Sequence, residues 1–280
     1  MSNSAILAFC MRDAAKISKT VIMSPPTHFD IEYSINPWMN LDNKVDKKAA
    51  LFQWQNLVDL YKNLGLKVKL IPASKGVPDL VFTTDHGVWI NDTFHLSNFK
   101  YPERQKEQKI ALKWYEAQKI KVQHTPSYCL MEGGDVMYHE NSIFVGYGFR
   151  TSHETIEYLH NTTRLEMIAL ELIDESFYHL DTCFLPINRD TAFFYPPAFS
   201  SSSIKILKSH FDILLPVTTH EADGFACNSV KINNHIICQP NPTFEQKLLD
   251  LDLIPISLEM SQFNKSGGGI HCLSQIITIY

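Results

Sequence analysis

The sequence predicts an α/β protein in which five ββαβ-type units surround one axis as a five-fold pseudosymmetric propeller. Two observations predict this fold class. Short β-like segments recur in pairs, and each pair precedes a stretch with helical spacing and another short apolar strand. Polar residues at these hairpins recur at steps of 50, 46, 47 and 44 residues, namely Asp85, Asp135, Asp181, Asn228 and Cys272. An ordinary α/β fold with alternating strands and helices would give a similar period.

The paired segments are short enough to form hairpins. They are 80–84 with 88–91, 135–138 with 142–146, 181–185 with 191–195, and 228–232 with 235–239. His-Glu-Asn, Asn-Arg-Asp and Asn-Asn provide turn chemistry in three of them. We expect helices at 103–118, 152–164, 200–210 and 243–250, followed by strands at 119–123, 166–171, 212–217 and 253–257. An earlier copy of this tail lies at 46–64 and 66–71, and segment 271–280 opens a fifth unit.

Five such units bury their apolar strands between sheets and helices, and bring one end of every unit to the centre. Residues far apart in the sequence then converge on one pocket. No Pro-, Gly- or Ser-rich linker divides the chain, since the run 200–203 fits a helix N-cap. We therefore expect one catalytic domain over 21–280, after an N-terminal extension of unknown role, 1–20.

The composition excludes several function classes. The chain has 280 residues, 20% of them charged, and a net charge of −5 with scattered Lys and Arg, so nucleic acid is not an expected partner. No apolar run approaches the roughly 20 residues of a membrane span, and no clear signal cleavage site follows the N-terminus. The cysteines lack CxxC spacing, which predicts reduced thiols in the cytoplasm and no metal site: Cys10, Cys129, Cys183, Cys227, Cys238 and Cys272.

Cys272 differs from the other cysteines in its surroundings. Cys129, Cys183, Cys227 and Cys238 lie in apolar runs, which is typical of buried, inert thiols. Cys272 instead follows three consecutive glycines, 267–269, which are costly unless the backbone approaches another group closely. A cysteine just after such a loop can face a ligand.

A nucleophilic cysteine needs a proton shuttle, and histidine is the usual one. His179 and Asp181 would share one face of a strand at positions i and i+2. Glu132 and Asp135 flank a Gly-Gly pair, and Asp85 ends an apolar stretch. Each has an ordinary structural alternative: a core histidine with its hydrogen bonds satisfied, a solvated acid in a turn, or a turn cap.

The five-unit register places Asp85, Asp135, Asp181 and Cys272 at equivalent edges. Several carboxylates around one cysteine indicate a substrate with a delocalised positive charge. A guanidinium group fits, because its planar fork of donors pairs bidentately with carboxylates.

These motifs resemble the guanidino-group-modifying superfamily, which has the pentein fold and includes arginine deiminases, dimethylargininases, agmatine deiminases, arginine dihydrolases and amidinotransferases. The segments 23–39, Gly-Tyr-Gly-Phe-Arg at 146–150 and Tyr-His-Leu-Asp-Thr-Cys-Phe at 178–184 look like the arginine dihydrolase and short dimethylargininase branch. Phe-Thr-Thr-Asp at 82–85 is closer to arginine deiminases, and Gly-Gly-Gly-Ile-His-Cys at 267–272 is similar to agmatine deiminases.

The resemblance implies a role for each candidate residue. Cys272 would be the nucleophile and His179 the general acid and base, with Glu132 binding substrate and polarising His179. Asp85 and Asp181 would hold the guanidinium nitrogens. Arg104 and Arg150 would hold the substrate α-carboxylate, and Asn36 and Asp135 are further candidates for the pocket. No cofactor and no metal is expected.

The resemblance also leaves the reaction open. The dihydrolases of this branch carry Asn where this chain has Asp85, which favours a single hydrolysis of arginine or a methylated arginine to citrulline. Arginine dihydrolysis to ornithine, amidinotransfer, modification of protein arginines and an arginine-binding module without activity remain alternatives. A homodimer is a further expectation from the superfamily.

Overall fold

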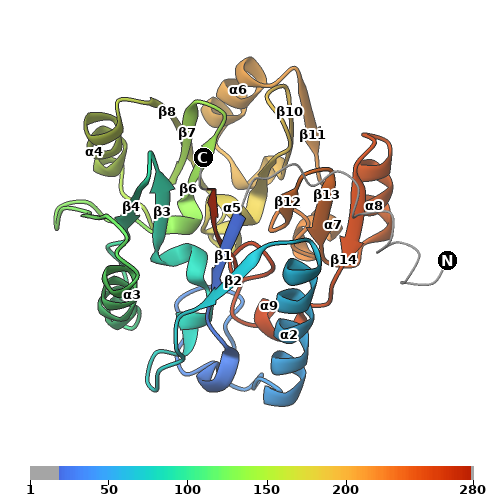
Figure 1. Cartoon of the computed structure of the whole chain (residues 1–280). Helices are drawn as coiled ribbons and strands as arrows, with labels where there is room; N and C mark the ends of the chain where they lie inside the picture. Colours follow the sequence, from blue (N-terminus) through green and yellow to red (C-terminus); the bar gives the residue numbers. More distant parts are fainter. Residues whose placement is uncertain (1–18, 279–280) are drawn as a thin grey trace.

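The computed structural model describes residues 19–278. They form five sheets of three strands each around one axis, as Figure 1 shows. In each sheet the middle strand pairs antiparallel with the inner strand and parallel with the outer strand. The predicted five-unit α/β propeller is therefore confirmed.

Four sheets follow the chain in order, and the fifth joins its two ends. The four are β3 (Gly87–Ile90), β4 (Thr93–Leu96) and β5 (Val122–His124); β6 (Val136–His139), β7 (Ser142–Tyr147) and β8 (Glu166–Glu171); β9 (Phe184–Pro186), β10 (Thr191–Phe194) and β11 (Ile213–Pro216); and β12 (Val230–Ile232), β13 (His235–Cys238) and β14 (Ile254–Ser257). The fifth consists of β15 (Gln275–Thr278), β1 (Lys19–Met23) and β2 (Lys67–Leu70). Segment 271–280 thus opens the fifth unit, as predicted.

One longer helix precedes the outer strand of each sheet and lies on the outside of the propeller (Figure 1). These helices are α2 (Lys47–Asn63), α3 (Gln105–Ala117), α4 (Glu154–Thr163), α6 (Ser201–His210) and α8 (Pro242–Leu249). Local sequence starts several of them, because the side chains of Asp46, Ser200 and Asn241 accept hydrogen bonds from backbone N–H groups of the first turn. Each helix buries its apolar stripe, such as Trp54, Leu57 and Tyr61 in α2, against a sheet.

The first predicted hairpin is wrong, because its first strand does not form and the hairpin lies further along the chain. Residues 80–84 span the end of one 3₁₀ turn, η3 (Pro78–Val81), and the start of a second, η4 (Thr83–His86), and β3 pairs instead with β4. The hairpin turn is Asn91-Asp92, whose φ values of 47° and 59° suit these residue types. Pro78 starts the 3₁₀ turn that buries Leu80 and Val81 without a strand.

The strand expected at 181–185 begins later. Residues Leu180–Cys183 form a helical turn, α5, and β9 starts only at Phe184. The hydroxyl and the backbone N–H of Thr182 both donate to His179 O, at 2.7 and 3.1 Å, and this closes the turn. The expectation that His179 and Asp181 share one strand face is therefore wrong, although both side chains reach the same centre.

Lys19 and Thr20, which we assigned to the extension 1–20, belong to β1. Residues 1–18, with Cys10, lie outside the described residues. Among those described, no helix combines the length and apolar character that crossing a membrane requires.

Candidate active site

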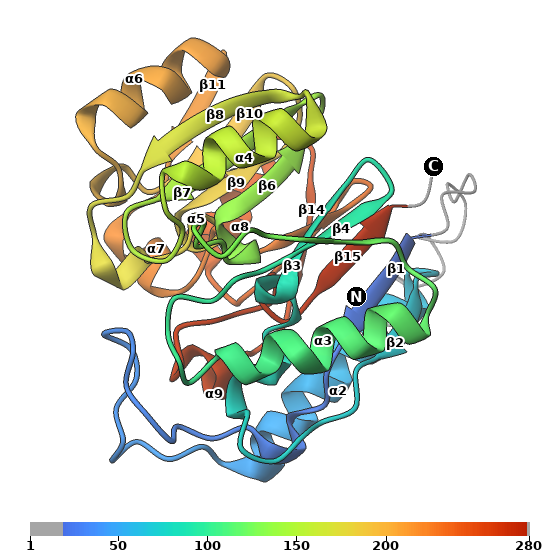
Figure 2. The ribbon, with the colours of Figure 1, turned by 90° about the vertical axis from the view of Figure 1, so that its left-hand side faces the viewer.

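Each unit carries a polar residue in a turn just before its inner strand. Asp85 precedes β3, Asp135 precedes β6, Asp181 precedes β9, Asn228 precedes β12 and Cys272 precedes β15. All five are buried. The short helices α5, α7 (Thr219–Asp223) and α9 (Ser261–Asn264) mark this end of the propeller in Figure 2, away from the end where β1 begins and β15 finishes. The repeat spacing thus correctly predicts that these residues converge.

The Cys272 thiol lies between Asp181 and Asn228. Its Sγ–H donates to Asp181 Oδ2 at 3.3 Å, and Asn228 Nδ2 donates to Sγ at 3.1 Å. Asn228 Oδ1 also accepts from the backbone N–H groups of Gly269 and Cys272, at 3.0 and 3.2 Å. Burial first, and then the carboxylates of Asp181 and Asp85, raise the pKa of Cys272 well above its ordinary value. The thiol is therefore protonated at neutral pH in the empty site.

The three glycines before Cys272 let the chain pass close to other groups. Gly267 has φ +83°, and a Cβ there would lie 2.8 Å from Tyr178 Oη. A Cβ at Gly268 would lie 2.4 Å from the Phe82 ring. Larger residues would push this loop away and displace Cys272.

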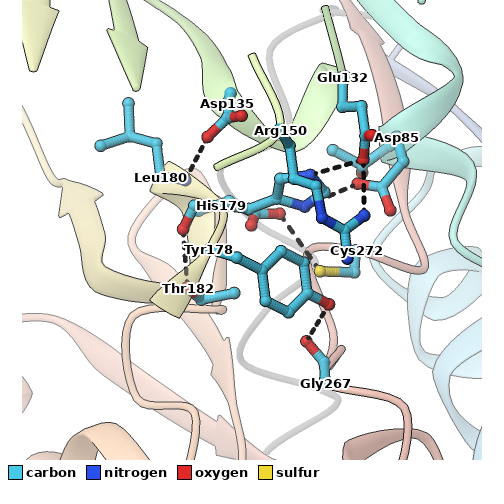
Figure 3. A network of polar contacts seen from close by, with 12 residues as sticks. Asp85, Glu132, Asp135, Arg150, Tyr178, His179, Leu180, Thr182, Gly267 and Cys272 are labelled. Atoms are coloured by element: carbon cyan, nitrogen blue, oxygen red, sulfur yellow. Dashed lines mark hydrogen bonds and ion pairs between the residues drawn. The ribbon is translucent and has the colours of Figure 1, made fainter. Parts of the chain in front are cut away.

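His179 lies between two carboxylates (Figure 3). Its Nε2 contacts Glu132 Oε2 at 2.9 Å, and its Nδ1 lies 3.4 Å from Asp85 Oδ1. Gly134 makes this arrangement possible, because a Cβ there would lie 2.7 Å from Nδ1. Burial alone would lower the pKa of His179, but Asp85, Asp135 and Glu132 raise it to about 9. The ring is therefore a cation at neutral pH and can act as an acid.

Arg150 closes one side of the site. Its Nη1 donates to Glu132 Oε2 at 3.0 Å, and its Nη2 donates to Ile35 O at 3.0 Å. The guanidinium lies over the rings of Tyr101 and Tyr178, 4.6 and 4.3 Å from their centroids. Burial opposes ionisation of Glu132, but Arg150 and then His179 hold its pKa below the ordinary value. Glu132 is thus a buried carboxylate shared by two cations.

Arg104 forms a similar ion pair with Asp85, the second carboxylate beside His179. Its Nη1 donates to Asp85 Oδ2 at 2.7 Å, while Nε and Nη2 donate to both oxygens of Glu107 at 2.9 and 2.8 Å. All three side chains are buried. Two arginines of the chain itself therefore pair with Asp85 and Glu132, the two carboxylates that contact His179.

Asp135 and Asn36 make hydrogen bonds to the backbone of segments that carry site residues. Asp135 Oδ1 accepts from Leu180 N at 3.0 Å, which fixes the start of α5, and burial raises its pKa to about 7. Asn36 Oδ1 accepts from Trp38 N, and its Nδ2 donates to Ser266 O at 3.1 Å. Neither makes a polar contact with Cys272 among the hydrogen bonds of the described residues.

Sequence reasoning left three important residues out of the site. Asn228 occupies the fourth repeat position, so the spacing itself could have identified it. Tyr178 donates to Gly267 O at 3.2 Å and stacks on Arg150, and Glu107 holds Arg104. In the sequence, Tyr178 and Glu107 are marked only by lying close to His179 and Arg104.

Within residues 19–278, no group of three or more His, Cys, Asp or Glu side chains could hold a metal ion. Chemistry without a metal stays a prediction.

A family model described as N,N dimethylarginine dimethylhydrolase, eukaryotic, matches residues 23–279. The chain belongs to this family. It therefore also belongs to the guanidino-group-modifying, or pentein, superfamily, as the motifs predicted.

Relatives of this chain include an uncharacterized protein, an arginine dihydrolase and a dimethylarginine dimethylaminohydrolase. An uncharacterized protein of Caenorhabditis elegans is 34% identical over 98% of both chains. The bifunctional arginine dihydrolase/ornithine cyclodeaminase ArgZ of Synechocystis is 34% identical over 92% of this chain, which spans only 37% of that protein. The N(G),N(G)-dimethylarginine dimethylaminohydrolase of Mycobacterium tuberculosis is 31% identical over 89% of this chain and 83% of its own.

The solved N-terminal domain of ArgZ, in a cysteine-to-serine variant bound to its substrate, superposes with a TM-score of 0.89. It is 32% identical, and the match covers 93% of this chain and 98% of that domain. The family is thus shown both by sequence and by fold.

Proposed function

We propose that this protein hydrolyses a guanidinium C–N bond of a free amino acid, arginine or an Nω-methylated arginine, through a covalent intermediate on Cys272. One observation supports this more than any other. The buried thiol has a raised pKa and is surrounded by carboxylates, with a cationic histidine in the same cluster. Such a site has low thiolate content when empty and gains thiolate when a guanidinium cation enters.

Asp85 and Asp181 would bind the guanidinium nitrogens and orient the central carbon toward Sγ. The thiolate attacks that carbon, and His179 gives its proton to the departing ammonia or methylamine as the C–N bond breaks. A thiouronium on Cys272 results. His179 then takes one proton from a water as the water oxygen bonds to the carbon. The C–S bond breaks with the electron pair on sulfur, and the remaining O–H proton leaves to solvent as the C=O bond forms. The product is a urea group, as in citrulline.

The internal ion pairs support a zwitterionic substrate. Arg104 and Arg150 now bind Asp85 and Glu132, the carboxylates that face the substrate cation. A guanidino amino acid carries both charges, so its guanidinium can take over the carboxylates while its α-carboxylate receives the released arginines. Agmatine lacks the α-carboxylate and would leave a buried guanidinium unpaired, which is costly.

The ornithine-forming alternative is favoured by the 34% identity to ArgZ, and Asp85 decides between the two. We expect Asp85→Asn to lower arginine turnover and to shift the product from citrulline toward ornithine. The amide removes the negative charge that pairs with Arg104 and with the guanidinium of the substrate. The guanidinium is then held less firmly in the position that leads to citrulline. Amino acid analysis after complete conversion measures the ratio. Ornithine as the main product of the unchanged protein would contradict the single hydrolysis.

The raised pKa of His179 predicts an alkaline limit to activity. The imidazolium must be present to protonate the leaving amine, so kcat/KM should fall as the pH rises through about 9. A pH profile of kcat/KM in a buffer series of constant ionic strength measures this. A rate that keeps rising beyond that pH would show that His179 is not the acid.

The test of the proposed function is a substrate panel. Purified protein is incubated separately with L-arginine, asymmetric dimethylarginine and agmatine, with Cys272→Ser as the control, and the products are identified by mass spectrometry. Citrulline from either amino acid, absent with the variant, supports the proposal and identifies the substrate. Transfer of the amidino group to an added amine would instead favour an amidinotransferase, and no turnover of any compound would contradict the proposal.

A further inference from the structure

A cavity of about 1270 Å³ lies on the axis, at the end of the propeller away from the catalytic cluster. The inner strands β3, β6, β12 and β15 line it together with the hairpin turns at 91–92 and 140–141. The catalytic residues precede these same strands, whereas the turns are at the opposite strand ends. We call this cavity the axial funnel.

The funnel reaches the back of the catalytic cluster at His271. Thr84, Gly133 and His271 belong to the turns at the cluster end of the strands, yet they line the funnel. His271 is the neighbour of the nucleophile in sequence, and its side chain is 25% exposed. Cys272 itself does not line the funnel and is 2% exposed. His271 therefore borders the funnel, whereas the catalytic thiol next to it in the sequence does not.

The ring of His271 contacts the carboxylate that contacts the thiol. His271 Nδ1 lies 2.8 Å from Asp181 Oδ2, and the same oxygen accepts from Cys272 Sγ at 3.3 Å. An ionised carboxylate only accepts hydrogen bonds, so Nδ1 carries the proton in this contact. The peptide is fixed, because His271 N donates to Asn228 O at 3.1 Å and Thr84 Oγ1 donates to His271 O at 2.6 Å.

We propose that His271 is a positioning residue for Cys272: its ring exchanges a proton with the axial funnel and, when charged, neutralises Asp181 and so eases loss of the thiol proton. No proton passes between sulfur and imidazole in this scheme. The ring takes a proton from funnel water at Nε2 while Nδ1–H continues to donate to Asp181. This control acts from behind the cluster, independently of the face that Tyr178 and Arg150 cover.

Electrostatics gives the direction of the coupling. A thiolate beside the ionised Asp181 is opposed by like charge, and a positive ring on Asp181 removes part of that opposition. The charged side chains that line the same funnel are Lys69, Lys119, Lys121, Lys231, Asp92 and Glu140. Asp181 is the carboxylate in direct contact with the ring, with Oδ2 2.8 Å from His271 Nδ1.

The test measures alkylation of Cys272 by iodoacetamide without substrate, by mass spectrometry of the peptide that contains it, from about pH 6 to about pH 10. His271→Asn keeps an N–H donor for Asp181 but cannot ionise. We expect the variant to react roughly tenfold more slowly than the unchanged protein at the acid end, the effect of about one pKa unit. The two rates should approach each other at the alkaline end, where the ring is neutral.

His139→Asn is the matched control. His139 also lines the funnel, but its Nε2 contacts Asn188 O at 2.9 Å rather than the cluster. Its alkylation profile should follow that of the unchanged protein. A ratio between the unchanged protein and His271→Asn that stays constant across the pH range would show a purely structural role and overturn the proposal. Thiolate absorbance, compared with a Cys272→Ser background, gives the same comparison if alkylation is slow.

A second measurement tests the route. Protein already alkylated at Cys272 is treated with diethyl pyrocarbonate, and modification of His271 is followed by mass spectrometry. Access through the funnel predicts an undiminished rate, whereas a rate that collapses after alkylation would mean that His271 is reached through the substrate side. Both measurements need no turnover. Their outcomes therefore test the coupling between His271 and Cys272 even if Cys272 serves a reaction other than the proposed hydrolysis. Only the role of this coupling in catalysis rests on the proposed function.

Discussion

Replacing Cys272 with serine is expected to lower kcat for guanidinium hydrolysis by about 10⁴-fold or more, because the covalent route disappears. The serine hydroxyl is far less acidic than a thiol, and Asp181, 3.3 Å from Sγ, opposes any negative charge there. His179 is already protonated at neutral pH, so it cannot remove a hydroxyl proton. Steady-state kinetics with the best compound of the substrate panel measures the loss.

The fold should tolerate this change. The serine hydroxyl can still donate to Asp181 and accept from Asn228, so we expect the free energy of unfolding to change by about 1 kcal/mol or less. Cys227→Ala is the matched control, because Cys227 is buried next to Asn228 in the sequence, but its thiol forms no hydrogen bond with Asp181, His179 or Cys272 among those of the described residues. It should keep its kcat. Comparable losses in both variants would trace the effect to packing rather than to the nucleophile.

The five-unit architecture could be predicted because its signals are local and repeated. Hairpin turns such as Asn233-Asn234 and helix starts such as Ser200 depend on a few neighbouring residues. The first hairpin is misplaced because a local signal is read without the turn residues on either side of it. Segment 80–84 is apolar enough for a strand, but Pro78 starts a turn and Asn91-Asp92 supplies the true hairpin.

The pairings inside the site could not be predicted from sequence. The spacing indicates that Asp85 and Cys272 meet, since equivalent turn positions of a closed ring share one centre. It does not indicate that Arg104 binds Asp85 and Glu107 at once, because that depends on where α3 places its first turn relative to another turn. The ion pairs of Arg104 and Arg150 with buried carboxylates are therefore visible only in the structure.

Replacing Glu132 with glutamine is expected to have the second largest effect, because two cations share this carboxylate. Arg150 Nη1 and His179 Nε2 both contact Glu132 Oε2, at 3.0 and 2.9 Å. A neutral amide leaves the guanidinium of Arg150 buried without a carboxylate. Removing one partner of a buried ion pair costs about 3–5 kcal/mol of the free energy of unfolding. Chemical denaturation at neutral pH measures this loss.

The same substitution should change the chemistry in a direction that stability alone cannot produce. Glu132 is one of the carboxylates that raise the pKa of His179, so its loss lowers that pKa, and the alkaline limit of kcat/KM moves to lower pH. We expect kcat to fall by roughly 10²–10³-fold at neutral pH, since the ring loses both its orientation and part of its charge. The pH profile of the variant measures both effects.

Glu221→Gln separates stability from catalysis. Glu221 is also fully buried and paired, with Lys247 Nζ at 2.6 Å, but it caps α7 through Thr218 and contacts no reacting group. The loss of its charge should lower the free energy of unfolding and leave kcat and the alkaline limit unchanged.

The raised pKa of His179 also predicts how stability depends on pH. The contribution of His179 to the free energy of unfolding is complete below about pH 6.5 and is lost as the pH rises through about 9. That loss should be smaller in Glu132→Gln and unaltered in Glu221→Gln, which ties the buried carboxylate to the proton that His179 donates.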